Sequence, residues 1–332
     1  MKRIIIDADT GIDDSLAILY ALRCPNFHVE GITTCFGNSN AAQSADNCLR
    51  LIKLSGCGYP VPVAVGANES LDGVFETAPA YIHGDNGIGN VILPESGEKT
   101  AEEPAWDFII RMADELKGEL VLVTTGRLTN LAKALLKDPA LPKKIKQVVV
   151  MGGTIRYPGN VGPYAEANIY GDPKAADMVF RAGFRLTLVG LDVTMKTFIT
   201  DRDLSQLAAC CRPDCRPIAE YIQKALTFYF EFHRVTLGMV SSCVVHDPLA
   251  MLIAEDPSLG TFQMYRAGVA CGSGPDRGTI YVDQGFVPVL DREEIAVCME
   301  VESEKAVRRL FSVFQDMEPG RYNWKTENGS EK

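Results

Sequence analysis

The residues whose types and spacing could do chemistry begin with four aspartates near the N-terminus. Asp7, Asp9, Asp13 and Asp14 lie within eight residues, directly after the apolar run Ile4–Ile6. Carboxylates this close repel one another, and the dipole at a helix N-terminus offsets only about 0.3–1 kcal/mol for each nearby charge. A hard divalent cation with oxygen ligands is the simpler remedy, because neither His nor Cys accompanies these residues. The alternative is an Asp-rich cap and turn without an ion.

Two known aspartate motifs compete for this stretch. An EF-hand loop requires Glu at its twelfth position, but counting from Asp7 that position is Ile18, so the match fails. Phosphohydrolases of the haloacid dehalogenase type also open with a strand followed by Asp-x-Asp, and there Asp7 would be the nucleophile. Such an enzyme also needs a downstream Lys and a late acidic pair in a loop. No convincing set is present, and a phosphohydrolase stays as the enzymatic alternative.

The elements around the aspartates predict where they lie. Ile4–Ile6 is short and β-branched, as in a buried parallel strand, and Ser15–Leu22 has the pattern of a buried helix. The stretch from Asp7 to Asp14 then covers the carboxyl end of the strand, the turn and the first helical turn. Open α/β sheets bind their ligands at this edge.

The rest of the chain alternates between strand and helix patterns. This alternation predicts an α/β fold with a mainly parallel open sheet flanked by helices. We expect strands at His28–Thr33, Val61–Val65, Leu120–Thr124, Gln147–Met151, Arg185–Leu191, Phe262–Val269, Thr279–Val282 and Ile295–Val301. Helices are expected at Ala41–Ser55, Pro104–Leu116, Leu128–Lys137, Pro173–Ala182, Asp201–Ala209, Pro213–His233 and Glu304–Phe314. We predict one domain over residues 1–317 and a loose polar tail over residues 318–332.

Further polar residues follow the predicted strands. Asn38 follows the second strand, and Thr125 follows Leu120–Thr124 in a sharp turn whose carbonyl could serve calcium. A long loop after Gln147–Met151 holds Asn160, Glu166 and Asn168. Amides beside one carboxylate suit vicinal hydroxyls better than phosphate, for which Arg or Lys would be expected.

Three histidines lie where function or helix chemistry could use them. His83 sits in a Gly-rich loop, and His233 ends a predicted helix, where a cation is favourable. His246 precedes Asp247 at an element boundary, and this pair could be a simple helix cap. Because the N-terminal aspartates need another oxygen ligand, we favour Asp247 as a metal ligand and His246 as an acid.

Composition limits the class of protein. The chain has 332 residues, 46% of them hydrophobic, and a net charge of -10, which argues against nucleic acid or an anionic membrane as the main partner. The apolar run near Met1 is too short for a signal peptide, and no stretch approaches the eighteen apolar residues of a membrane span. We therefore expect a cytoplasmic protein whose cysteines are mostly buried free thiols.

Together these motifs resemble the nucleoside hydrolases of the inosine-uridine-preferring type. The resemblance runs from Arg3 to about residue 310. It rests on DADTGIDD, GNSN, HGDNGIGN, TGRLTN, the loop MGG with N-x5-E-x-N, and the late HDP. It implies hydrolysis of the N-glycosidic bond of ribonucleosides in nucleoside salvage, with Ca²⁺ as cofactor and a homo-oligomer, either dimer or tetramer.

The resemblance also assigns roles to residues. Calcium would be held by Asp9, Asp14, Asp247 and the carbonyl of Thr125, and Asp9 would take a proton from water. The substrate residues it implies are Asp13, Asn38 and Asn168 for the 2'- and 3'-hydroxyls, Asn160 and Glu166 for the 5'-hydroxyl, His83 and His246 for the base, and Met151 for the floor of the ribose site.

Departures from the family pattern affect the sugar pocket. Arg127 replaces a small residue or Pro, and Ala167 replaces an aromatic residue between Glu166 and Asn168. The two Trp lie outside the matched motifs, which favours a pyrimidine-preferring or mixed enzyme over the purine-specific type that stacks its base between Trp rings. A calcium-dependent ribose-binding protein without turnover is the non-enzymatic alternative.

Overall fold

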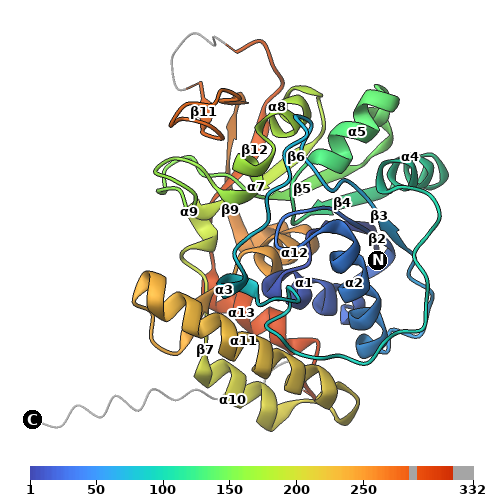
Figure 1. Cartoon of the computed structure of the whole chain (residues 1–332), viewed down its shortest axis with the longest axis vertical. Coiled ribbons are helices and arrows are strands. Elements are labelled where there is room, and N and C mark those ends of the chain that lie inside the picture. Colours follow the sequence, from blue (N-terminus) through green and yellow to red (C-terminus); the bar gives the residue numbers. More distant parts are fainter. Residues whose placement is uncertain (284–289, 317–332) are drawn as a thin grey trace, which may run out of the picture.

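A computed structural model describes residues 1–283 and 290–316, which are built around one eight-stranded sheet (Figure 1). Its strands are parallel except for β9, which pairs antiparallel with β12 at one edge. The predicted fold class is therefore confirmed. In spatial order the strands are β3 (Val63–Val65), β2 (Phe27–Thr34), β1 (Lys2–Ala8), β4 (Leu120–Thr124), β5 (Gln147–Met151), β6 (Leu186–Val189), β12 (Ile295–Val301) and β9 (Gly260–Tyr265).

Helices cover both faces of the sheet, which explains why β1 is a continuous apolar run. Alternate side chains of a strand point to opposite faces, and Ile4 and Ile6 lie in one buried cluster while Ile5 lies in the other. The first face is covered by α1 (Ile12–Arg23), α2 (Ala41–Ser55), α11 (Arg216–Leu237), α12 (Asp247–Glu255) and α13 (Ser303–Ser312). The second is covered by α4 (Ala105–Leu116), α5 (Thr129–Lys137) and α8 (Pro173–Arg181).

Shorter elements complete the described chain. The helices are α3 (Ala80–His83), α6 (Leu141–Lys144), α7 (Ala167–Gly171), α9 (Leu191–Thr194) and α10 (Asp201–Cys210), with single 3-10 turns at Pro213–Cys215 and Pro257–Leu259. Two small antiparallel sheets pair β7 (Phe198–Thr200) with β8 (Ser242–Val244) and β10 (Ala267–Val269) with β11 (Ile280–Val282).

The predicted strand Phe262–Val269 is wrong as a single element. The chain divides at Arg266, because β9 pairs with β12 in the central sheet whereas β10 pairs with β11 outside it. The Arg266 side chain donates a 3.1 Å hydrogen bond to the carbonyl of Arg292 at this break. The apolar pattern marked both strands but could not reveal their different partners.

The carboxyl ends of the central strands meet at one edge of the sheet. In the register of β1, Asp7 lies beside Thr33 of β2 and Thr124 of β4. Thr124 in turn lies beside Val150 of β5. The turns that follow these strands are therefore brought together, as the sequence predicted.

Two of the expectations from the sequence concern the C-terminal tail and membrane-spanning helices. The predicted polar tail, residues 318–332, lies outside the described residues. Among the described helices, none is both long enough and apolar enough to cross a bilayer.

Candidate functional site

Three buried carboxylates form a compact acidic group at this edge. Asp13 and Asp14 lie in the first turn of α1, and Asp247 is the first residue of α12. One oxygen from each lies within 4.8 Å of the other two. Gly11 precedes α1 and must lack a side chain, because a Cβ there would lie 2.5 Å from Nδ2 of Asn38. Helices α1 and α12 pack against each other in the core, which brings the distant Asp247 to the N-terminal aspartates.

Asp9 lies beside this group and is held by Asn38. The main-chain N–H of Asn38 donates to Oδ2 of Asp9 at 3.0 Å, and its side-chain amide donates to Oδ1 at 3.1 Å. The same Nδ2 also donates to Oδ2 of Asp14 at 3.1 Å. One amide therefore spans two carboxylates that repel each other, which fixes their relative position.

Burial and mutual repulsion disfavour the ionised forms of Asp9, Asp13 and Asp247. Burial, followed by the charge of Asp14, raises the pKa of Asp13 to about 7 and that of Asp9 well above its ordinary value. Burial, followed by the charges of Asp13 and Asp14, also raises the pKa of Asp247. Arg127 opposes the shift at Asp9. The group therefore needs either protons or a cation to be stable.

The turn after β4 joins the acidic group to the loop after β5. The hydroxyl of Thr125 donates to Oδ1 of Asp14 at 2.7 Å. The carbonyl of Thr125 accepts from Nδ2 of Asn168 at 2.7 Å, and that amide also donates to the carbonyl of Met151 at 3.2 Å. Asn168 therefore ties together the ends of β4 and β5 beside the acidic group.

Glu166 and Asn160 shape the loop that contains Asn168. The carboxylate of Glu166 caps α7, accepting from the N–H of Asn168 at 2.9 Å and of Ile169 at 3.2 Å, and it also accepts from Gly153 at 2.8 Å. Asn160 accepts from the N–H of Ala167 at 3.0 Å. Both side chains thus organise the backbone, and burial raises the pKa of Glu166.

His83 reaches the aspartate turn from a distant loop. Its Nδ1 accepts from the N–H of Ile12 at 3.2 Å, so the neutral ring has its proton on Nε2. Burial, followed by the nearby His233, lowers the pKa of His83 to about 3. The ring stacks on Tyr229 of α11 with 5.5 Å between centroids.

The interpretation of His233 as a cation at a helix end is wrong. Helix α11 continues to Leu237, and the His233 side chain is buried against Tyr229. Burial lowers its pKa, so the ring is neutral at neutral pH. The sequence could not show that this helix is one turn longer.

His246 is fixed by a residue from another element. Its Nδ1 lies 2.9 Å from the hydroxyl of Thr194, at the end of α9. Burial, followed by His233 and His83, lowers the pKa of His246 to about 3. The imidazole is therefore neutral near pH 7, and it could offer a hydrogen bond more readily than a transferable proton.

The donor set suits a hard divalent cation. Largely buried carboxylates that have an Arg partner, such as Asp177 and Glu255, lie elsewhere in the described part of the chain. Asp13, Asp14 and Asp247 offer only oxygen atoms, and the raised pKa values of Asp13 and Asp247 reflect charge that a cation would neutralise. The structure therefore fits a hard divalent cation, and its compact group contains Asp13, whereas the set of metal ligands expected from the sequence had Asp9.

Asp7 cannot be the nucleophile of a phosphohydrolase. Its side chain is fully buried, and Oδ1 accepts from the hydroxyl of Thr33 at 2.6 Å and from the amide of Asn130 at 2.8 Å. A nucleophile must be reached by its substrate, whereas this carboxyl joins the ends of β1 and β2 to the start of α5. The phosphohydrolase alternative is therefore wrong.

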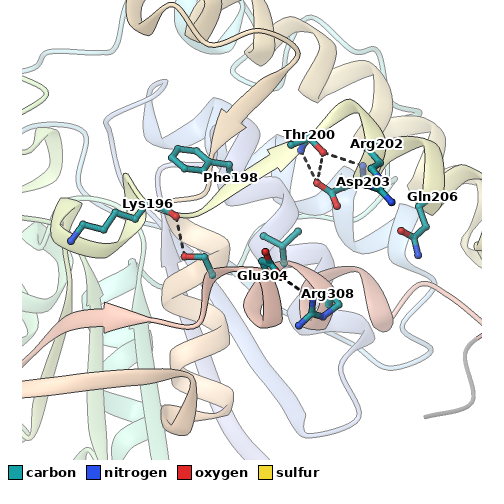
Figure 2. Close-up of a pocket in the computed structure, with 10 residues that line it drawn as sticks. Lys196, Phe198, Thr200, Arg202, Asp203, Gln206, Glu304 and Arg308 are labelled. Atoms are coloured by element: carbon teal, nitrogen blue, oxygen red, sulfur yellow. Dashed lines mark hydrogen bonds and ion pairs between the residues drawn. The ribbon is translucent and has the colours of Figure 1, made fainter. Parts of the chain in front are cut away.

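A separate pocket of about 530 Å³ lies between the β7–α10 segment and α13 (Figure 2). Figure 2 shows a hydrogen bond between Thr200 and Asp203 and an ion pair between Glu304 and Arg308. Its lining is completed by Lys196, Phe198, Arg202, Gln206, Ser303 and Val307. None of these residues belongs to the acidic group.

Sequence reasoning missed two contacts of the site. Thr194 contacts His246 across 52 positions, and no local pattern indicates that pair. Tyr229 stacks on His83, and its spacing of four from His233 places both on one face of α11, which is the signal that could have indicated it.

Known proteins of one kind match the chain along most of its length. The sequence profile described as inosine-uridine preferring nucleoside hydrolase matches residues 4–308. Uridine nucleosidase 1 of Arabidopsis thaliana is 38% identical over 79% of this chain and 76% of that protein. The plant nucleoside hydrolase PpNRh1 is 33% identical, with a TM-score of 0.89 over 95% of this chain and 99% of that one. A purine-preferring ribonucleoside hydrolase from Gardnerella vaginalis is 36% identical, with a TM-score of 0.87 over 94% and 98%.

Proposed function

The chain belongs to the family of inosine-uridine preferring nucleoside hydrolases and is a ribonucleoside hydrolase, and we propose how its residues divide the reaction. The reaction breaks the N-glycosidic bond with water and releases the free base and ribose. The observation that supports this assignment best is the buried, oxygen-only group of Asp13, Asp14 and Asp247 at the ligand-binding edge of the sheet.

Calcium is the proposed cofactor. Asp9, Asp14, Asp247 and the carbonyl of Thr125 would hold the ion, and Asp13 is close enough to contribute. Bound calcium would orient the sugar hydroxyls and the attacking water by coordination. The side chains themselves supply the proton transfers and the remaining contacts.

Asp9 is the proposed general base. A base must be ionised before it accepts a proton from water, and burial opposes ionisation here. The two hydrogen bonds from Asn38 and the positive charge of Arg127 favour the carboxylate. The same carboxylates stabilise the positive charge that develops on the ribose ring as the bond to the base breaks.

The sugar would be held by groups on both sides of the acidic cluster. Asp13, Asn38 and Asn168 are proposed for the 2'- and 3'-hydroxyls, with Asn160 and Glu166 for the 5'-hydroxyl. Met151 would form the floor. Fixing the ring in this way removes much of the entropic part of the barrier.

His246 and His83 are the proposed groups for the base. The departing base gains negative charge and benefits from a hydrogen-bond donor. If the hydroxyl of Thr194 donates to Nδ1 of His246, the neutral ring has its proton on Nε2. A neutral imidazole can act in this way, because a strong hydrogen bond suffices to stabilise a developing anion.

Base preference is proposed to be mixed or in favour of pyrimidines. The relatives named above include a uridine nucleosidase and a purine-preferring enzyme, so both groups of substrate belong in the test. Purified protein with calcium should be assayed for ribose release from uridine, cytidine, inosine, adenosine and guanosine. Binding of ribose or nucleosides without any release would favour the non-catalytic alternative. A homo-oligomer, either dimer or tetramer, is also proposed, and light scattering after size exclusion would test it.

A further inference from the structure

Arg127 is a buried cation in the turn between β4 and α5. Its side chain is 8% exposed, and its guanidinium lies over the ring of Phe36 at 4.2 Å. Nη1 donates a 2.7 Å hydrogen bond to the carbonyl of Glu76. Among the described residues no carboxylate forms an ion pair with it, although its charge acts on the buried carboxyls of Asp9 and Glu166.

The backbone on the other side leaves room for this guanidinium. A Cβ on Gly171, the last residue of α7, would lie 1.8 Å from Nε of Arg127 and 2.8 Å from its Cζ. Arg127 therefore fills the space between α7 and the turn after β2, where Phe36 lies. A planar group is needed to fit between an aromatic ring and a helix backbone.

The same guanidinium holds an exposed segment, residues 70–78, against the site. This segment carries Phe75, whose ring lies 6.4 Å from that of Phe36. Its Ala78 donates an N–H to the carbonyl of Gly37 at 2.7 Å. Gly37 in turn lies against Asp9, because a Cβ there would lie 1.7 Å from Oδ2 of that carboxylate.

Three segments thus meet at Arg127, and two of them lead to side chains proposed to hold the sugar. Phe36 and Gly37 lead to Asn38, which bonds both Asp9 and Asp14. Helix α7 contains Asn168, which bonds the carbonyl of Thr125. We infer that Arg127 is a positioning residue, whose guanidinium clamps residues 70–78 and α7 to the Asn38 turn and so sets the distance between the Asn38 and Asn168 amides. This inference rests on the proposed function.

The first test is Arg127→Ala with chemical rescue. Loss of the clamp should lower kcat/KM for uridine by about 10–100-fold, the range typical when supporting residues are removed. The loss should be equal for p-nitrophenyl riboside, because the two substrates share the sugar. The ratio of kcat/KM for uridine to kcat/KM for deoxyuridine should fall. Guanidinium at millimolar concentration, far below the molar range that denatures proteins, should restore activity, whereas sodium and urea should not.

The second test keeps Arg127 and fills the space that its guanidinium occupies beside α7. Gly171→Ala should reproduce the loss, because the added Cβ would displace the guanidinium, and guanidinium should not rescue it. Gly272→Ala is the matched control, since the nearest heavy atom to its added Cβ is 4.0 Å away. Calcium content and the thermal midpoint are measured for each variant, so that a folding defect is recognised.

The outcomes separate the inference from the proposed function. If the parent enzyme fails to release ribose, the proposed function itself is wrong. The clamp is wrong if the parent enzyme is active and Arg127→Ala has the same kcat/KM. It is also wrong if Arg127→Ala loses activity that guanidinium does not restore while its preference for uridine over deoxyuridine is unchanged. Full activity of Arg127→Lys would also overturn it, because charge alone would then suffice. Rescue of Arg127→Ala together with impaired Gly171→Ala supports the clamp.

Discussion

The hydroxyl of Thr194 lies 2.9 Å from Nδ1 of His246, although 52 residues separate them in the chain. Thr194 ends α9, whose first residue, Leu191, donates an N–H to the carbonyl of Gly153 at 2.9 Å. The orientation of the imidazole is thus linked to the loop after β5. Because the ring is neutral, the direction of this one hydrogen bond determines which nitrogen has the proton.

We predict that Thr194→Val slows the hydrolysis of uridine and inosine by about 2–10-fold, which corresponds to a hydrogen bond of about 0.5–1.5 kcal/mol. Valine keeps the shape of threonine but cannot set the proton position on His246. Thr194→Ser restores the hydroxyl and should recover most of kcat. Equal rates for the parent and the Val variant would show that the contact does not influence the reaction.

Asp14→Ala should abolish calcium binding and activity together. Asp14 contacts Asn38 and Thr125 and belongs to the compact acidic group, so its loss removes both a ligand and an anchor. Calcium content is measured by elemental analysis after dialysis. Asp46→Ala, at a half-exposed aspartate that pairs with Arg50, is the control and should keep both. Full calcium occupancy in Asp14→Ala would refute the assignment.

Calcium should stabilise the protein more as the pH rises. Without metal, the raised pKa values of Asp9, Asp13 and Asp247 mean that the folded state holds protons that the unfolded chain releases above about pH 4. The stabilisation that these bound protons give the folded state is present at low pH, and it is lost as the pH rises through about 7, the pKa of Asp13.

The measurement is the difference in thermal midpoint between calcium and EDTA from about pH 5 to pH 8. Comparing the two at each pH removes the separate effect of the neutral buried histidines, which destabilise the folded state below about pH 6.5 in both conditions. We expect the difference to widen with pH. A constant difference would mean that calcium does not replace protons on these aspartates.

Deoxyuridine should be a poor substrate. A site built to bind a 2'-hydroxyl leaves buried polar groups unpaired when it is missing, which costs about 10⁴–10⁵ in selectivity. The proposed partners, Asn38 and Asn168, already make hydrogen bonds that hold them in place. Comparable kcat/KM for uridine and deoxyuridine would contradict their assignment to the hydroxyls.

The sequence predicted the sheet and the edge at which the candidate site lies, because both depend on local pattern. Apolar runs and the turns after them placed Asp7 to Asp14, Asn38 and Thr125 at strand ends, and parallel pairing then required those ends to meet. The strand Phe262–Val269 failed because its two halves have different partners. A pattern of burial indicates that a segment is a strand, but it does not indicate which other strand that segment pairs with.

The site was predictable in its residue types and less so in its contacts. The sequence could not determine that Asp13 rather than Asp9 shares the compact group, because that depends on which way each carboxylate points in the turn after β1 and the first turn of α1. The contacts of Thr194 with His246 and of Arg127 with Glu76 join segments far apart in sequence. Their side chains are ordinary types whose roles arise only from packing.

Replacement of His246 distinguishes the base end of the site from the sugar end. His246→Ala should slow a natural nucleoside by roughly 10²–10³, the usual loss when one hydrogen-bond donor to a developing anion is removed. A p-nitrophenyl riboside needs no such help, because its leaving group is already stable as an anion, so the same variant should cleave it at nearly the parent rate.

Calcium content should be unchanged, although Asp247 is the next residue. Equal losses on both substrates would mean that His246 mainly supports the acidic group. No loss on either would mean that the ring has no part in the reaction, and it does not cap α12, because its side chain makes no capping hydrogen bond. Arg127→Ala, which acts on the sugar, should impair both substrates alike, and the two variants together therefore test whether the site is divided in this way.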